Sequence, residues 1–103
     1  MPRRVIGQGR LTCPNVATQI SAESITGSAI IFISDDGTAA ANGNVANQII
    51  GLGNADMTLL NSWPLRANDT LTIDAPRGSQ IEISDFYTMS SDGNQVLSWM
   101  VIG

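Results

Sequence analysis

Hydrophobic and polar positions alternate with a period of two along much of the C-terminal half of the chain. Residues 70–74, TLTID, alternate between polar and apolar side chains. They lie between a polar turn sequence at 66–69 and a second turn sequence at 76–78. Residues 79–89 continue the alternation and place Ile81 and Ile83 on one side. Successive side chains of a β-strand point to opposite faces of its sheet, so this period predicts strands with one buried face.

Two segments are apolar at nearly every position. Residues 29–34, AIIFIS, stop at the Asp-Asp-Gly turn sequence of residues 35–37. Residues 95–103, QVLSWMVIG, follow the turn sequence of residues 91–94. A continuous apolar run is typical of a strand that is buried on both faces. We therefore expect both segments in the interior of a sheet.

Other parts of the chain are less regular. Residues 1–12 hold a proline and two glycines, which indicates an N-terminal arm or an edge strand. Residues 15–21, NVATQIS, alternate and predict a strand with one solvated face. Residues 38–57 are rich in Ala, Asn and Gly without a clear period. We expect a long loop there with a short strand at residues 49–50, or alternatively a short helix over residues 45–50.

Strands separated by turn signals about every ten residues are typical of all-β domains. The sequence predicts a single-domain antiparallel sandwich of about seven or eight strands, jelly-roll-like, or a small barrel. A chain of 103 residues suffices for one core. We expect the sandwich to span residues 13–103, after the arm or edge strand of residues 1–12.

Charged residues make up only 14% of the chain, well under the usual quarter. All five positive charges are Arg, nine residues are acidic, and the net charge of −4 argues against a general affinity for nucleic acid. Without His, the chain lacks the usual general base and the commonest metal ligand. A weakly charged surface suits a protein that packs against other proteins.

The single cysteine, Cys13, cannot form an internal disulfide. We expect a small buried hydrophobe rather than a reactive thiol, because no His or Lys is present to stabilise a thiolate. The N-terminal sequence MPRRVIGQGR has the charges of a signal peptide without its apolar region, and no segment reaches the length of a membrane span. We expect a chain that folds in a cytoplasm and has no membrane partner.

Several patterns resemble ligand or catalytic sites. Residues 35–37 and 92–94 cluster oxygen donors, but they lack EF-hand spacing, so turns are expected there instead of calcium sites. Residues 51–56 resemble the start of a dinucleotide fingerprint in which Asp replaces the third glycine. Glu82 and Asp85 would point to opposite faces of a strand, unlike a glycosidase pair. We therefore expect no catalytic residue, no cofactor and no metal.

The two tryptophans have different settings. Trp99 lies among apolar neighbours within a predicted strand, so we assign it to the core. Trp63 precedes Pro64, which cannot lie in a central strand, so Trp63 is the better candidate for an exposed contact. A carbohydrate-binding module is an alternative that would require a second aromatic on the same exposed face as Trp63. An enzyme would require Asp85 and Asp92 to converge in a cleft.

The order of strand and turn segments from residue 12 to residue 103 is itself a pattern. The chain carries TCPNVATQISA, an apolar strand, a loop, WPLRANDTLTIDAPRGSQIEI and finally SSDGNQVLSWMVI. This order resembles that of small virion proteins of tailed bacteriophages. Those proteins usually have Gly at the position of Asn68, and Asn tolerates the same left-handed turn conformation.

The resemblance implies a non-enzymatic structural protein on the capsid surface, assembled in the host cytoplasm. It points to a decoration or cement protein that binds the outside of the assembled shell, with a head-fibre or tail-associated subunit as the alternative. The implied partners are the major capsid protein and copies of the same chain, with no nucleic acid and no membrane. We expect the partner contacts at Arg3, Arg4, Val5, Ile6, Trp63 and the loop of residues 38–57.

Overall fold

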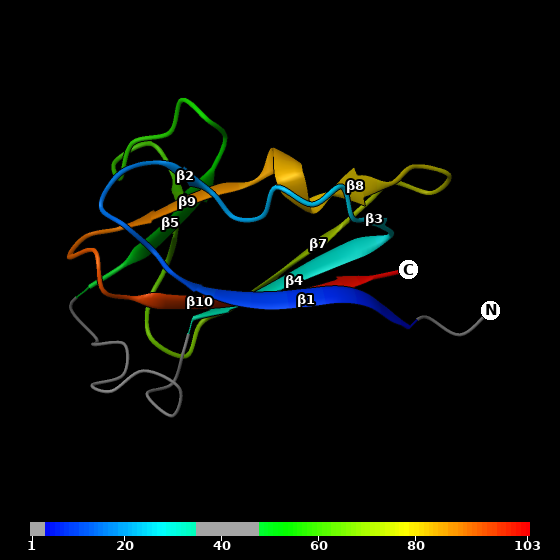
Figure 1. Ribbon diagram of the computed structural model, residues 1–103, viewed down its shortest axis with the longest axis horizontal. Coiled ribbons are helices and arrows are strands. Elements are labelled where there is room, and N and C mark those ends of the chain that lie inside the picture. Colours follow the sequence, from blue (N-terminus) through cyan, green and yellow to red (C-terminus); the bar gives the residue numbers. More distant parts are fainter. Residues whose placement is uncertain (1–3, 35–47) are drawn as a thin grey trace.

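The computed structural model describes residues 4–34 and 48–103, which form an antiparallel β-sandwich (Figure 1). The first sheet, sheet A, contains in spatial order β1 (Val5–Thr12), β10 (Val96–Ile102), β4 (Ala29–Ser34) and β7 (Thr70–Asp74). Sheet B contains β2 (Thr18–Gln19), β9 (Tyr87–Ser90), β5 (Ile50–Gly53) and β6 (Trp63–Leu65). The short strands β3 (Thr26–Gly27) and β8 (Ile81–Glu82) pair with each other, and a single 3₁₀ turn, η1, spans Ile83–Asp85.

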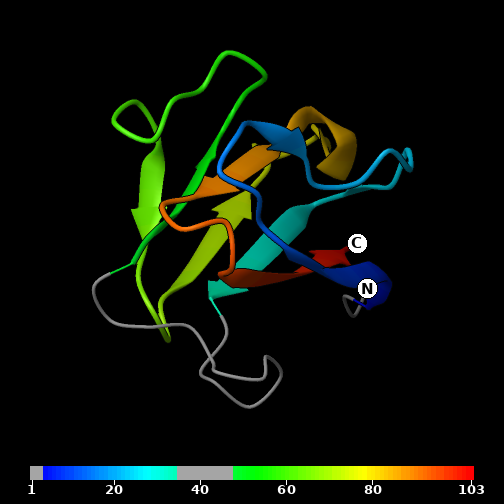
Figure 2. The same cartoon turned by 60° about the vertical axis from the view of Figure 1, so that its left-hand side comes forward.

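The strands pair as one long hairpin that is folded back on itself. β1 pairs with β10, β2 with β9, β3 with β8, β4 with β7 and β5 with β6, all antiparallel. Two further pairings, β10 with β4 and β9 with β5, roll the hairpin into two sheets (Figure 2). This nested arrangement is the jelly-roll topology. The predicted all-β antiparallel sandwich is thus confirmed, and the described residues form ten strands rather than seven or eight.

The hydrophobic core lies between the two sheets. It consists of Cys13, Ile20, Ile30, Phe32, Ile50, Leu52, Leu65, Ile83, Leu97, Trp99 and Val101. Trp99 pairs with Gly9 in the register of β1 and β10, and a Cβ added at Gly9 would lie only 2.7 Å from the indole ring. Glycine on β1 therefore leaves the space that the ring occupies. The assignment of Trp99 to the core is correct.

β4 and β10 are the central strands of sheet A, as expected for the two apolar segments. The prediction that both faces of β4 are buried is wrong, however. Ile33 is 43% exposed and Ile31 is only half-buried, because both point away from sheet B. An apolar run shows that the side chains on both faces of a strand are apolar, but it does not show whether a second layer covers each face.

Two predicted strands are shorter in the structure. Residues 79–89 are interrupted by η1, in which Ile83 is fully buried, and the chain passes there from pairing with β3 to pairing with β2 and β5. Residues 15–21 form a strand only at Thr18–Gln19. The alternation of these residues places Val16 and Ile20 on one face, yet Val16 is exposed and Ile20 is buried. Short alternations predict a strand without fixing its length.

The N-terminal segment is an edge strand rather than a free arm. β1 pairs with β10 from Val5 to Thr12 and is an outer strand of sheet A. The turn at 35–37 and the loop up to residue 47 lie outside the described residues. Within the remainder of the predicted loop, β5 starts at Ile50, and the described residues of the alternative helix are not helical.

The predicted turns at the other strand ends contain left-handed residues. Asn68 has a φ of 72°, and its turn is closed by the Asp69 N–H donating to the Arg66 carbonyl at 2.9 Å. Gly78 and Gly93 have φ values of 85° and 76° in the turns at 76–78 and 91–94. The left-handed conformation expected of Asn68 is confirmed.

Candidate functional site

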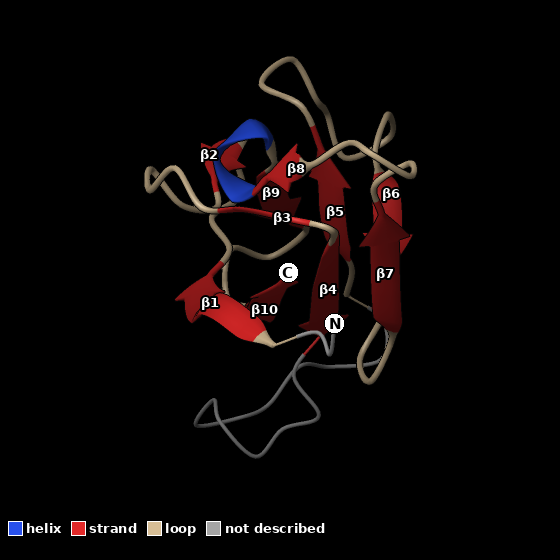
Figure 3. Cartoon of the chain, turned by 90° about the vertical axis from the view of Figure 1, so that its right-hand side faces the viewer, coloured by secondary structure: helices blue, strands red, loops and turns tan. Residues whose placement is uncertain are grey.

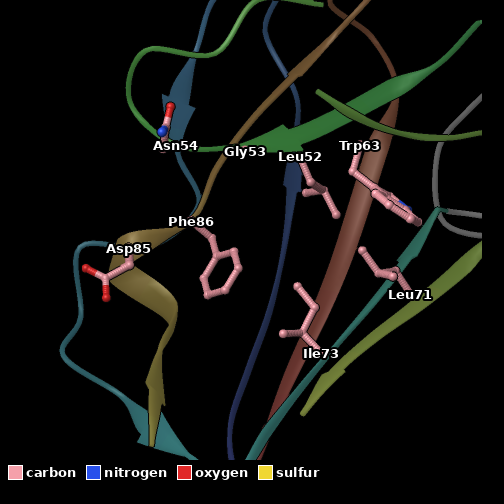
Figure 4. Close-up of a pocket in the computed structure, with 8 residues that line it drawn as sticks. All are labelled: Leu52, Gly53, Asn54, Trp63, Leu71, Ile73, Asp85 and Phe86. Atoms are coloured by element: carbon pink, nitrogen blue, oxygen red, sulfur yellow. The ribbon is translucent and has the colours of Figure 1, made fainter. Parts of the chain in front are cut away.

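β6 and β7 are outer strands of the two sheets and lie on the same side of the sandwich (Figure 3). An apolar cleft of about 420 Å³ opens between them. It is lined by Leu52, Gly53, Asn54, Trp63, Leu71, Ile73, Asp85 and Phe86. The five large apolar side chains surround the space, while Asn54 and Asp85 lie apart from each other at the end opposite Trp63 and Leu71 (Figure 4). The cleft therefore offers an apolar interior with polar groups confined to one end.

The sequence leaves this side of the core uncovered for two local reasons. β6 is only three residues long and holds Pro64, which has no N–H and cannot donate to a further strand. β7 is the last strand of sheet A, so the inward side chains of Leu71 and Ile73 have no neighbour beyond it. Both are consequently only half-buried. A compact core would need one more strand here.

Trp63 lies on the rim of this cleft and is 61% exposed (Figure 4). Phe86 lines the same cleft, so two aromatic side chains share it, as the carbohydrate alternative requires. Phe86 is half-buried, however, and its ring packs against Phe32 with 5.4 Å between the centroids and 54° between the planes. Only Trp63 presents a largely free aromatic face.

The other predicted contact residues lie at the opposite edge of sheet A. Val5 and Ile6 are 48% and 50% exposed, and Arg4 pairs through its backbone with Gly103, with both hydrogen bonds at 3.0 Å. Arg3 lies outside the described residues. β1 and β7 are the two outer strands of this sheet, so the structure separates these residues from Trp63 (Figure 3). The predicted contacts form two surfaces rather than one.

Two of the acidic residues considered as ligands or catalysts, Asp92 and Glu82, have local hydrogen-bond partners. Asp92 accepts hydrogen bonds from the Asn94 N–H at 2.9 Å and from the Gln95 amide at 2.8 Å, as in a turn. Glu82 accepts a hydrogen bond from the Ser84 hydroxyl at 2.6 Å. Within residues 4–34 and 48–103, no three His, Cys, Asp or Glu side chains are grouped to hold a metal.

Residues 51–56 do not form a nucleotide-binding loop. β5 ends at Gly53, and the chain then turns, with the Met57 N–H donating to the Asn54 carbonyl at 3.1 Å. A dinucleotide fingerprint would instead open a helix at this point. Asp85 lines the cleft, but its carboxylate points away from the apolar side chains (Figure 4).

Three lining residues are not recognised from sequence as parts of a site. Leu52 falls in a segment expected to be a loop, while Leu71 and Ile73 are assigned only to a strand. Pro64 was the available signal, because it marks an edge strand and therefore an incompletely covered core. Which outer strand of the other sheet lies next to the strand of Pro64 depends on the pairing of segments that are distant in the chain.

Cys13 belongs to a small buried polar cluster rather than to the cleft. Its side chain is fully buried, and burial raises the pKa of the thiol from 9.0 to about 11. The Thr88 hydroxyl donates to the Gly51 carbonyl at 3.0 Å and contacts Cys13 Sγ at 3.4 Å, while the Ser90 hydroxyl donates to the Cys13 carbonyl at 2.6 Å. The expectation of a buried thiol is correct.

The raised pKa of Cys13 predicts a loss of stability in alkaline solution. Above about pH 9 the thiol ionises in the unfolded chain while it stays protonated in the folded protein. Ionisation therefore lowers the free energy of the unfolded state relative to that of the folded state. The free energy of unfolding should therefore fall by about 1 kcal/mol between pH 8 and pH 10 through this group. Urea unfolding of the wild type and of Cys13→Ala at several pH values isolates the effect, since all other groups are common to both. Parallel pH profiles would contradict the burial of this thiol.

Residues 4–34 and 48–103 are built of strands, turns and one short 3₁₀ segment. No helix in these two ranges is long and apolar enough to cross a membrane. Comparisons of the chain with protein-family models, with curated proteins and with solved structures found no match.

Proposed function

We propose that this chain is a non-enzymatic structural protein of a tailed-bacteriophage virion. It binds the outside of the assembled capsid, as a decoration or cement protein, and stabilises contacts between neighbouring capsid subunits. The order of its strands and turns, which resembles that of such virion proteins, supports the proposal. The low content of charged residues, 14%, suits a surface that is covered by other proteins.

One structural observation carries the proposal: the sandwich presents exposed apolar side chains at two opposite edges. Val5 and Ile6 lie on β1, at one edge of sheet A. Trp63 lies on β6, the outer strand of sheet B, and lines the cleft together with residues of β7, the other outer strand of sheet A. A protein that contacts two neighbours through opposite edges can bridge them. Many identical weak contacts then add up across a symmetric shell. Because each copy binds the assembled shell better than separated subunits, it favours the assembled state.

The decisive experiment is a count of this chain in purified particles of the phage that encodes it. A decoration protein should be present in copies on the order of hundreds, as expected for a subunit that repeats with the shell symmetry. About a dozen copies or fewer would favour the head-fibre or tail-associated alternative. Absence from the particles would overturn the proposal. Particles that lack the protein should also release their DNA at a lower temperature than complete particles.

Carbohydrate binding is the second candidate, because Trp63 and Phe86 line one cleft. The polar side chains that line the cleft are those of Asn54 and Asp85, both at one end. A bound sugar needs several hydrogen-bond partners, so this lining suits a sugar less well than an apolar group. A glycan array with the wild type and with Trp63→Ala distinguishes the two functions. Glycan binding that disappears in the variant would support a carbohydrate-binding module, and an array without binding would count against it.

A further inference from the structure

β7 has a free hydrogen-bonding edge beside the apolar cleft. The Ala75 N–H donates to the Ser28 carbonyl at 2.8 Å, and the Ser34 N–H donates to the Asp69 carbonyl at 2.9 Å. In an antiparallel pair, alternate residues bond to the neighbouring strand, so Leu71 and Ile73 direct their backbone groups toward β4. The backbone groups of the alternate residues, Thr70 and Thr72, point outward from the sheet.

These outward groups are unused within the described part of the chain. No backbone hydrogen bond there, beyond those of the strand ladders, involves Thr70 or Thr72. The same strand turns the side chains of Leu71 and Ile73 into the cleft (Figure 4). A free edge and an adjacent apolar cleft therefore meet along one strand.

The other outer strands do not combine these two features. β2 is only two residues long, and β6 is three residues long and contains Pro64. β1 is eight residues long, but its inward glycine positions are already covered, since Ile25 lies over Gly7 and Trp99 lies over Gly9. Of the four outer strands of the two sheets, β7 thus offers both pairing groups and an uncovered apolar space.

We propose that β7 binds an extended segment of another protein as an added β-strand, with two bulky apolar side chains, two residues apart, seated in the cleft. Main-chain hydrogen bonds to Thr70 and Thr72 would supply affinity, and the cleft would select the alternate side chains. The inference needs only the edge and the cleft, so it does not depend on a virion role. In a virion, a capsid subunit would supply the segment.

The chemistry of the site favours a strand over other occupants. A helix has no free backbone groups in its middle to pair with the edge at Thr72, because its own hydrogen bonds use them. A sugar would leave the apolar side chains of Leu52, Leu71 and Ile73 against hydroxyl groups. An extended segment satisfies the edge with its backbone and fills the cleft with every second side chain.

The test uses a synthetic peptide, acetyl-KTLTITK-amide, titrated into the full chain. We expect a saturable blue shift of Trp63 fluorescence, because the rim side chain becomes covered, together with amide chemical-shift changes at Thr70 and Thr72. A peptide of the same sequence, N-methylated at alternate residues on the edge that faces β7, keeps the side chains and loses the donors. It should bind at least about tenfold more weakly.

Protein variants provide a second arm. Thr72→Pro removes one outward N–H without breaking the ladder to β4, and its binding is followed by Trp63 fluorescence. Trp63→Ala removes the rim, and its binding is followed by the amide shifts of Thr70 and Thr72. Each variant should bind at least about tenfold more weakly. Thr12→Pro is the matched control, because Thr12 points its N–H outward from the other edge of sheet A, and it should bind like the wild type. The N-methylated peptide keeps the test valid even if Thr72→Pro does not fold.

Three results would each overturn the inference. The first is the lack of any saturable change with the peptide. The second is equal binding of the N-methylated peptide, which would show that the cleft takes apolar side chains without strand pairing. The third is binding of maltohexaose or cellohexaose at Trp63 instead of the peptide, which would identify a sugar site. None of these results depends on the copy number in particles, so the two proposals fail separately.

Discussion

Replacing Phe32 with alanine is expected to lower the free energy of unfolding by about 3–5 kcal/mol. Phe32 is fully buried on the central strand β4 and packs against Phe86, with 5.4 Å between the ring centroids. Its removal leaves a cavity between the two sheets, where neighbouring strands are held by their ladders and cannot collapse into it. A domain of this size is stabilised by about 5–15 kcal/mol in total. Urea unfolding followed by circular dichroism measures the loss.

Ile33→Ala is the matched control for this prediction. Ile33 is the next residue of the same strand, points to the opposite face and is 43% exposed. Its truncation should cost less than about 1 kcal/mol, because a largely solvated side chain leaves no cavity. A shift of the strand by one residue would exchange the two faces. Equal losses for both variants, or a larger loss for Ile33→Ala, would therefore show that β4 is not placed as described.

Substitution of Gly27 by alanine is expected to lower the free energy of unfolding by about 1–3 kcal/mol. A Cβ at this buried position would lie 2.5 Å from the backbone oxygen of Ile102 and 2.6 Å from Cγ1 of Val101. A backbone atom in a paired strand cannot move aside as a flexible side chain can. β3 would have to shift away from the end of β10, which would weaken its pairing with β8. Chemical denaturation again provides the measurement.

Thr26→Ala tests whether the effect of Gly27→Ala arises from this close approach. Thr26 is the exposed neighbour on the same short strand, and its truncation should change the free energy of unfolding by no more than about 0.5 kcal/mol. If Gly27→Ala were equally mild, β3 would not lie against the end of β10. A marked loss for Gly27→Ala alone would support the contact.

The jelly-roll topology explains why both functional proposals concern edges. Nested pairing satisfies the inner strands of each sheet but leaves β1 and β7 as the outer strands of sheet A. Exposed outer strands are sites where other chains can pair unless they are short, charged or interrupted. β2 and β6 are short, and β6 also contains Pro64. The binding capacity proposed for this protein is therefore concentrated on sheet A and on the cleft beside it.

The sequence by itself determined the local features of this protein. The alternation in residues 70–74 predicted β7 with its correct bounds, and the apolar segments predicted the central strands β4 and β10. The burial of Trp99 and Cys13 also followed from their neighbours and from the residues that the chain lacks. These features depend on side-chain period, turn chemistry and backbone preferences over a few residues, which are written locally in the chain.

Only the tertiary structure decided how these elements meet. The cleft joins Leu52, Trp63 and Leu71 from three strands with Phe86, which lies between η1 and β9. The exposed Val5 and Ile6 lie at the far edge of sheet A. The exposure of Ile33 was likewise settled by which face of the sheet is covered. Alternation shows which side chains share a face, but the partner of each strand and the layer above it depend on contacts between residues far apart in the chain.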